Sequence, residues 1–536
     1  MPSVIRYSGS VNEDRSKRSG LLSFLYCCAL LLCGLLATYL LSLAMKSGMG
    51  ISSDSIAYIG VSEHIVAGKG LNWIGGDGTL QPMTHFPPLY PLLLAGIQTA
   101  GLSSIEAARW INDLAFGANV FMIGWFIFRI SGNFFAPIVG SLLAACSPIM
   151  ISWHSMAMSE PIFITFLLVG MGLLSKYFER KRVILLIGAG VLFGLHYLTR
   201  YAGLSIIVAS TLAIFLSRAF NTKQKIRSIL MFLLVCITPM MVWMVRNMYL
   251  AGNFTNRRIL WHPPSVSKVK HAFAIFWEWI VPYKFTYTVL YGIIFSLLIT
   301  AIFLVIYYRK LGKEKCIKKV DRALKNSLLI ILILYALCYS LLILATMTFF
   351  DASTPMDTRI TLPLYIVFLI LMPSALTILF RGRSKPLKYI LLCTLSGLLL
   401  VSYIHRSVEL IDVISVYPRG YGSESKQQFA DIDELRELPA DTVIYTNNIE
   451  GLYFQFNLYG HRTPIGFDSV TMLNKPQYKQ ELTQMRELLE TEKAVLVLFF
   501  THIRITPSEW TDGLKLWWEY QGTALYAAKD FYDRNP

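Results

Sequence analysis

Two acidic residues in this chain stand where a polar loop meets a long apolar run. Asp54 follows the apolar run 21–45, and Glu160 stands at the start of the run 159–177 in the order Ser159-Glu160-Pro161. Ionisable groups at the edge of a membrane are costly and usually functional. A carboxylate in such a place can accept a proton from an acceptor hydroxyl group.

Each of these polar features also has a purely structural interpretation. Asp54 could cap a helix of about 55–67. The order Ser159-Glu160-Pro161 is typical of a helix start, with Ser as the N-cap and an acid in the first turn. His85 could be a packed imidazole, and Arg200 in a tight turn could be an anchor at the membrane interface.

The composition places the chain among helical membrane proteins. Apolar residues make up 54% of the 536 residues and charged residues only 15%, whereas soluble domains carry about 25% charged residues. The net charge of +16 could indicate nucleic acid binding. However, the basic residues cluster in short loops between apolar runs, which is typical of cytoplasmic loops. We therefore expect no nucleic acid partner.

These basic clusters predict the path of the chain through the membrane. Run 86–100 is too short to span and is disrupted by three prolines, so we expect a half-buried, juxtamembrane helix. The parity of crossings then predicts about eleven transmembrane helices, over 21–45, 107–128, 134–152, 159–177, 183–198, 203–217, 228–250, 286–307, 326–349, 359–380 and 387–404.

The C-terminal tail has a different composition. It is more polar and has strand-like runs at 442–445, 494–500 and 523–528, with a helical stretch over about 475–491 between the first two. Strands that alternate with helices predict a small α/β domain. The expected organisation is a cytoplasmic segment 1–20, an all-α polytopic membrane bundle 21–404 and an extracytoplasmic soluble α/β domain 405–536.

The order of five polar segments on the expected outer face resembles the GT-C glycosyltransferases. Within that superfamily the chain is most similar to the protein O-mannosyltransferase and lipid A aminoarabinose transferase branch. The segments are Asp54, Pro87-Pro88-Leu89-Tyr90-Pro91, Ser159-Glu160-Pro161, Leu198-Thr199-Arg200-Tyr201-Ala202-Gly203 and Arg359-Ile360-Thr361-Leu362-Pro363. The resemblance covers roughly residues 21–405 and not the tail.

The resemblance implies an inverting transfer of a sugar from a polyprenyl-phosphate donor to an acceptor on the outer face. Asp54 would be the general base, and Glu160 matches the acid of the second outer loop. Many members carry two adjacent acids in the first loop, whereas here Ser55 follows Asp54. His85 stands where some relatives carry a metal-binding carboxylate. Whether the enzyme uses a divalent metal stays open, with His85 and His262 as candidate ligands.

Displacement of a polyprenyl phosphate also requires positive charge at the departing phosphate. Arg200 and Arg359 are the favoured phosphate ligands because both stand at helix ends. Tyr201 and His85 complete the expected substrate-binding set together with Arg257 and Arg258, although these two adjacent arginines could equally be solvated. The aromatic residues near the loop 251–284 form either an interfacial belt or a groove for the lipid donor.

Two other functions remain open at this stage. In a multi-pass transporter or flippase the acids would bind a cation or proton, and in a receptor the tail would bind the ligand. Transporters usually show paired halves and broken helices at the middle of the membrane. The sequence shows no such pairing and the acids lie at the outer boundary, so we favour the glycosyltransferase, with a protein, lipid or glycan acceptor. We expect it in a bacterial cell membrane, with the site and tail outside.

Overall fold

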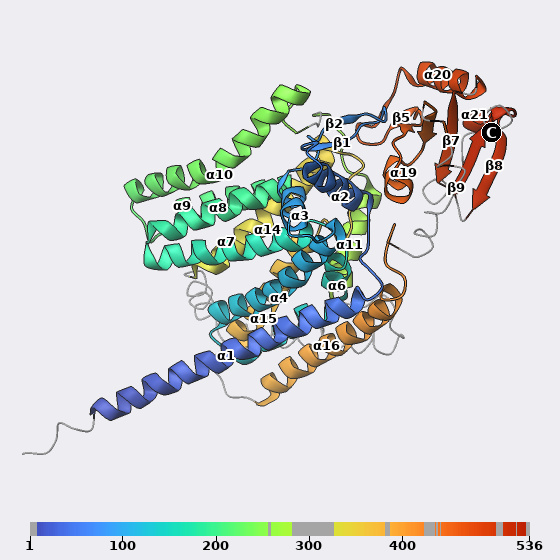
Figure 1. The fold of residues 1–536 in the computed structure, drawn as a ribbon. Helices are drawn as coiled ribbons and strands as arrows, with labels where there is room; N and C mark the ends of the chain where they lie inside the picture. Colours follow the sequence, from blue (N-terminus) through green and yellow to red (C-terminus); the bar gives the residue numbers. More distant parts are fainter. Residues whose placement is uncertain are drawn as a thin grey trace, which may run out of the picture.

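The computed structural model describes residues 8–255, 259–280, 326–380, 386–422, 435, 438–439, 441–491, 493–499, 508–520 and 523–531. Most of these residues form a bundle of apolar helices, and a smaller mixed sheet follows near the C-terminus (Figure 1). Three predicted features lie outside the described residues: the expected span 286–307, Arg257 and Arg258.

The bundle is built from long helices at the predicted apolar runs. Its main helices are α1 (Ser8–Ala44), α4 (Ser104–Ser131), α7 (Glu160–Arg180), α8 (Val183–Thr199), α9 (Leu204–Leu216), α10 (Thr222–Ala251), α14 (Ser327–Ala345), α15 (Leu362–Phe380) and α16 (Pro386–Ile414). Helices α1 and α4 cross closely, since a Cβ atom added at Gly34 would lie 2.8 Å from the Gly117 carbonyl oxygen. Small residues allow such close crossings between membrane helices.

Five described helices are long and apolar enough to cross a membrane, and a bent helix pair raises the number to six. Helices α8 and α9 are apolar but shorter, and the apolar part of α15, Leu362–Ile378, is also shorter. The count of eleven spans therefore remains a prediction. Helix α16 continues to Ile414, so the predicted domain boundary at 404 falls inside a helix.

The expected span 134–152 is not one continuous helix. The chain forms α5 (Phe135–Ala145) and α6 (Pro148–His154), which meet at an angle of 52°. Ser147 caps α6 by accepting a hydrogen bond from the Met150 amide, and Pro148 follows at the first position of the helix. This Ser-Pro pair starts a new helix because proline lacks the amide that would continue α5.

The short apolar run that was expected to lie at the membrane surface forms α3 (Leu89–Gln98). Its ten residues give a length of about 15 Å, which is half the thickness of a bilayer core. It packs beside α2 (Ser53–Val66) and α4, close to a hairpin of β1 (Asn72–Ile74) and β2 (Leu80–Pro82). This group of elements lies at the end of the bundle that faces the tail (Figure 1).

The tail contains a five-stranded sheet in the order β4-β3-β7-β9-β8. The strands are β3 (Val443–Thr446), β4 (His461–Arg462), β7 (Ala494–Phe499), β8 (Lys515–Tyr520) and β9 (Thr523–Ala527). Strand β7 is buried along its whole length, and its alternate side chains join two separate apolar clusters on the two faces of the sheet. Helix α20 (Tyr478–Glu490) covers one face, with Met485 and Leu489 in the cluster there.

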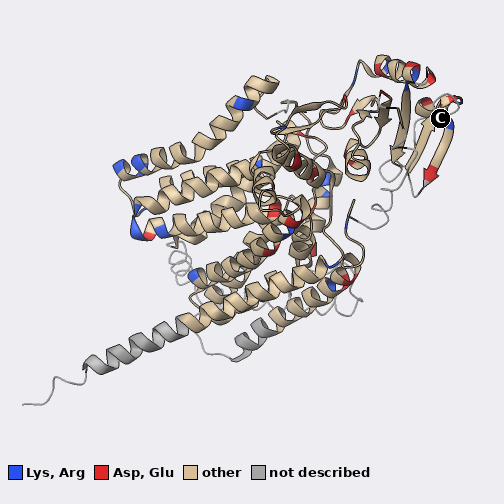
Figure 2. Ribbon diagram, viewed as in Figure 1, with Lys and Arg blue, Asp and Glu red and all other residues tan. Residues whose placement is uncertain are grey.

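Charge is distributed unevenly over the bundle. Lys and Arg residues gather at the α7–α8 and α9–α10 turns, at the end away from the tail (Figure 2). Short basic loops stay on the cytoplasmic side. The distribution supports the expected orientation, in which the tail and the α2–α3 region lie outside.

We expect a cysteine at Ser103 to react with a membrane-impermeant thiol reagent in intact cells, and one at Lys223 to be protected. Both side chains are exposed, and they lie at opposite ends of the helices. The measurement is labelling of single-cysteine variants in a cysteine-free background. Ser155 on the outer loop is not a suitable reporter because it is only 3% exposed. Labelling at Lys223 and protection at Ser103 would reverse the orientation.

Candidate functional site

Asp54 lies in the first turn of α2 but does not cap that helix. Ser52 is the N-cap, with its hydroxyl oxygen accepting from the Ser55 amide and the Ser55 hydroxyl oxygen accepting from the Ser52 amide. The interpretation of Asp54 as the cap is therefore wrong. Its carboxylate instead accepts a hydrogen bond from Arg359, with 2.5 Å between Nη2 and Oδ2.

Glu160 begins α7 and is buried, with 3% of its surface exposed. Its Oε1 atom accepts from Arg200 Nη1 at 2.5 Å and also from Arg359 Nε. Its Oε2 atom is buried and has no hydrogen-bond partner. The expected cap at Ser159 is wrong, because its side chain makes no capping bond and instead accepts from Arg200 at 3.4 Å.

Arg359 is held in a tight turn just before α15. The Asp357 side chain accepts a hydrogen bond from the Ile360 amide at 2.9 Å, and the Tyr339 hydroxyl donates to the Ile360 carbonyl at 2.9 Å. The indole of Trp153 donates to Thr358 in the same turn at 3.0 Å. These contacts fix the backbone on both sides of Arg359, so its guanidinium reaches both acids from a rigid support.

Arg200 stands at the C-terminal end of α8, where the backbone becomes extended before the short helix η1 (Tyr201–Gly203). The buried His196, one turn earlier, stacks on Phe163 of α7 with ring centroids 3.6 Å apart. Its Nδ1 atom lies 2.8 Å from the Phe163 carbonyl oxygen. This contact ties α8 to α7 and so places Arg200 beside Glu160.

Tyr201 is engaged in packing contacts near the site. Its hydroxyl donates to the Thr84 carbonyl at 3.2 Å and accepts from the Trp243 indole at 3.1 Å. The first contact links the α8–α9 turn to the loop that carries His85, and the second links it to α10. Tyr201 therefore holds the loop as well as being a candidate substrate ligand.

Asp54, Glu160, Arg200 and Arg359 thus form one connected set of charges, which we call the four-charge network. Burial by itself would lower the pKa of the Arg359 guanidinium, but the Glu160 carboxylate and then Asp54 raise it above its usual range. Burial, followed by the negative charge of Asp54, raises the pKa of the nearby Tyr58 hydroxyl to about 12. The network therefore holds two fixed positive charges and two carboxylates at one end of the bundle.

This arrangement can support proton removal next to an anion. The carboxylates can accept a proton, and the guanidinium groups can bind a phosphate by charge-assisted hydrogen bonds. Asp54 and Arg359 are partly accessible, with 30% and 21% of their side chains exposed, whereas Glu160 is enclosed at 4%. Arg200 is 24% exposed, so an incoming ligand can reach Asp54 and both arginines but not Glu160.

Among the residues that the structure describes, neither metal candidate belongs to a group of possible metal ligands. His85 is exposed on its loop, and its ring packs edge-on against Phe86. His262 is buried, with Nδ1 2.8 Å from the Met347 carbonyl oxygen and Nε2 without a partner. Within the described residues, no group of three His, Cys, Asp or Glu side chains could hold a metal ion. A role for a metal stays a hypothesis.

Two asparagines on α4, which are not among the site residues predicted from the sequence, support the segment 154–161. Asn112 donates to the carbonyl oxygens of His154 and Met156 at 2.8 and 2.6 Å. Asn119 donates to the carbonyl oxygen of Pro161 at 3.1 Å. Their spacing of seven residues places both on one face of an apolar helix. This pattern is visible in the sequence and could have predicted a polar contact on that face.

The aromatic residues of the segment 251–284, which includes helix α11 (Val266–Ile280), divide between surface and core. Trp261 and Trp277 are 71% and 53% exposed, as an interfacial belt would require. Trp279 is buried at 5% and packs against Tyr365 of α15, with ring centroids 5.4 Å apart. Trp279 therefore belongs to the bundle core and not to a belt.

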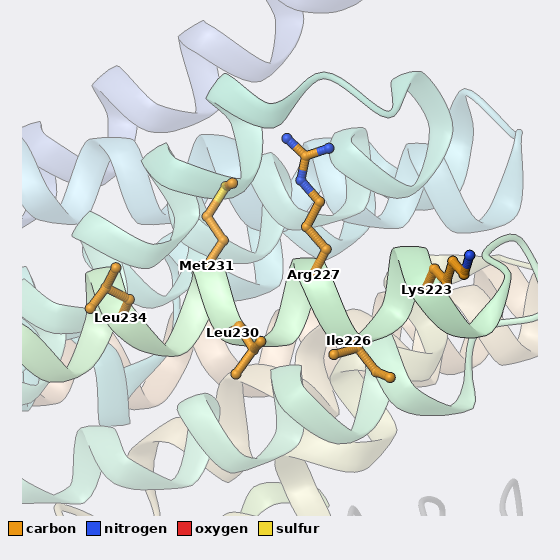
Figure 3. Close-up of a pocket in the computed structure, with 6 residues that line it drawn as sticks. All are labelled: Lys223, Ile226, Arg227, Leu230, Met231 and Leu234. Atoms are coloured by element: carbon orange, nitrogen blue, oxygen red, sulfur yellow. The ribbon is translucent and has the colours of Figure 1, made fainter.

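A separate hollow of about 540 Å³ lies along α10 (Figure 3). It is lined by Lys223, Ile226, Arg227, Leu230, Met231 and Leu234, and is almost entirely apolar. These residues lie near the start of α10, at the end of the helices opposite Arg200. The hollow therefore does not belong to the four-charge network.

The comparisons with known proteins agree on one class of fold. Residues 85–243 match the family model of dolichyl-phosphate-mannose-protein mannosyltransferases. A search of curated sequences gives no significant match. Together with the structural relatives below, the family match shows that the chain has the fold of the GT-C membrane glycosyltransferases, as the order of its outer segments predicts.

Three solved structures illustrate the likeness. ArnT from Cupriavidus metallidurans, bound to undecaprenyl phosphate, has a TM-score of 0.55 at 11% identity over 92% of this chain and 97% of its own. The Archaeoglobus fulgidus oligosaccharyltransferase, in complex with Zn and sulfate, has a TM-score of 0.55 at 12% identity over 88% and 68%. The arabinofuranosyltransferase AftD from Mycobacteria has a TM-score of 0.52 at 11% identity over 93% and 40%.

Proposed function

We propose that this protein is a glycosyltransferase that moves a sugar from a polyprenyl-phosphate donor to an acceptor on the outer face of a bacterial cell membrane. The observation that carries the proposal is the four-charge network. Four helix ends that are far apart in sequence bring two carboxylates and two arginines into direct contact at one end of a GT-C fold. The bound undecaprenyl phosphate of ArnT supports a lipid-linked donor by analogy.

In the proposed reaction, Asp54 accepts the proton of the acceptor hydroxyl group. The acceptor oxygen forms a bond to the anomeric carbon while the bond between that carbon and the phosphate oxygen breaks, with inversion. The electron pair leaves with the polyprenyl phosphate, whose charge Arg359 and Arg200 stabilise. Glu160 holds both guanidinium groups in place, because its Oε1 atom contacts each of them.

The contact between Arg359 and Asp54 suggests how donor binding prepares the base. In the present arrangement the guanidinium is shared between two carboxylates. A donor phosphate that takes up part of this guanidinium would weaken its hold on Asp54. Asp54 is the more accessible of the two acids. Once Arg359 releases it, the Asp54 carboxylate can accept a hydrogen bond from the acceptor hydroxyl group.

The test in cells is mass analysis of cell-envelope glycans and glycolipids, with and without the gene. We expect one modified species to disappear and to return with the wild-type protein but not with Asp54→Asn. Asp512→Asn is the matched control, since Asp512 is an exposed acid in the tail. An unchanged envelope together with altered uptake or export of a solute would favour a transporter instead.

A further inference from the structure

Helix α2 carries Asp54 and is contacted at both ends by the chain that follows the bundle. Two stretches make these contacts, residues 419–422 and residues 448–459, which we call the tail clamp. They are joined to each other because Asn448 Nδ2 donates to the Tyr421 hydroxyl at 2.6 Å. Helix α19 (Ile449–Phe456) of the clamp lies beside α2 (Figure 1).

The first contact fixes the strand that leads into α2. The Ile51 amide donates to the Arg419 carbonyl at 2.9 Å, and the Tyr421 amide donates to the Ile51 carbonyl at 2.8 Å. Gly420 lies between these bonds with φ of +68°, and a Cβ atom there would lie 2.0 Å from the Ile51 carbonyl oxygen. Only glycine allows the backbone at position 420 to come so close to Ile51, which is three residues before Asp54.

The second contact fixes the C-terminal half of α2. The Tyr453 hydroxyl donates to Glu63 Oε2 at 3.0 Å, while Ser104 of α4 donates to Glu63 Oε1 at 2.9 Å. The Tyr453 ring packs edge-on against Trp73 of the β1–β2 hairpin, with centroids 5.3 Å apart. Glu63 therefore joins the tail, α2 and the bundle in one chain of hydrogen bonds.

We propose that the tail clamp positions Asp54 for catalysis, with Tyr453 and Gly420 as positioning residues. The inference rests on the proposed function, in which Asp54 is the base. The two contacts hold α2 on both sides of Asp54, so they set where its carboxylate lies relative to Arg359 and the acceptor. A displacement of about 1 Å at a reacting group can reduce a rate by about a hundred-fold.

Tyr453→Phe removes the hydrogen bond to Glu63 and keeps the aromatic ring. We expect kcat to fall about ten-fold, with little change in the KM for the lipid donor, because Asp54 and not the phosphate site moves. The kcat of Glu63→Ala should fall by a similar factor, and the kcat of the double variant should be little lower than that of either single variant.

The matched control is Tyr478→Phe, which removes a comparable Tyr–Glu hydrogen bond of 2.9 Å to Glu509 on the far side of the tail. Equal turnover of the Tyr453→Phe and Tyr478→Phe variants, or a change in KM alone, would overturn the proposal.

Gly420→Ala tests the first contact, with Gly513→Ala as its control. Both glycines have a positive φ, +68° and +78°, but a Cβ atom at Gly513 would meet nothing within 4 Å. The two variants therefore share the backbone strain and differ in the clash with Ile51. We expect the turnover of the Gly420→Ala variant to be at least ten-fold lower than that of the Gly513→Ala variant. If the Gly420 variant does not fold, Tyr453→Phe remains the deciding test.

Hydrogen exchange of the amides 53–66 gives a readout that does not depend on sugar transfer. Tyr453→Phe should speed exchange in α2 relative to the wild type, whereas Tyr478→Phe should not. If exchange is faster in Tyr453→Phe but the wild type shows no transferase activity, the tail clamp stands and the proposed function is overturned. Unchanged exchange in an active enzyme would overturn the clamp alone.

Discussion

Asp54→Asn is expected to abolish sugar transfer while the protein still folds and inserts. A general base contributes about 100- to 10,000-fold to a rate, and asparagine cannot accept the proton. The fold should survive because the cap of α2 is made by Ser52 and Ser55 and does not involve the Asp54 side chain. The measurement is turnover of a lipid-linked sugar donor by purified protein, with thermal unfolding as the check on folding.

Two further variants make this result specific. Asp512→Asn, at an exposed acid in the tail, should keep full turnover. Ser52→Ala removes the cap and should lower stability by about 0.5–2 kcal/mol, with a smaller effect on turnover than Asp54→Asn. Turnover of Asp54→Asn within a few-fold of the wild type would mean that Asp54 is not the base.

Arg359→Ala is expected to have the second large effect. Arg359 contacts both acids and is the proposed ligand of the departing phosphate. Each lost charge-assisted hydrogen bond is worth about 1.5–3 kcal/mol, so we expect the rate to fall about a hundred-fold or more. Arg359→Lys should recover only part of this, because one ammonium group cannot replace a fork of nitrogen donors.

Loss of either arginine should reduce activity more than stability. Removing the partner of a buried carboxylate costs about 3–5 kcal/mol, but Arg200 still pairs with Glu160 when Arg359 is lost. Arg359 likewise still pairs with Glu160 when Arg200 is lost. We therefore expect each arginine variant to lose less stability than this value. Arg200→Ala should slow transfer about ten-fold. Arg486→Ala, in an exposed pair with Glu490, is the control. Full activity of both the Arg200 and Arg359 variants would contradict the phosphate site.

The sequence predicted which residues lie on one face of the membrane but not which of them touch. Long apolar runs and basic loops place Asp54, Glu160, Arg200 and Arg359 at one end of the bundle. Arg359 and Asp54 are 305 positions apart, and their contact depends on how the helices pack. No local pattern encodes that packing.

Local chemistry explains the errors at the helix starts. Ser52 and Asp54 are both good caps, and only the register of the first turn decides between them. The break between α5 and α6 had a readable signal in Ser147-Pro148, since a capping serine before a proline is typical of a helix start. The docking of the tail on α2 had no such signal, because Tyr453 and Gly420 act across the tertiary structure.

The most direct test of the central claim is a transfer assay with purified protein in lipid. The reaction contains a polyprenyl-phosphate sugar and a membrane extract as the acceptor source, and the released polyprenyl phosphate is measured. We expect release by the wild type that depends on the acceptor, with none above background for Asp54→Asn. Sugar transfer from a soluble nucleotide sugar without any lipid carrier, or equal release by the wild type and Asp54→Asn, would contradict the account.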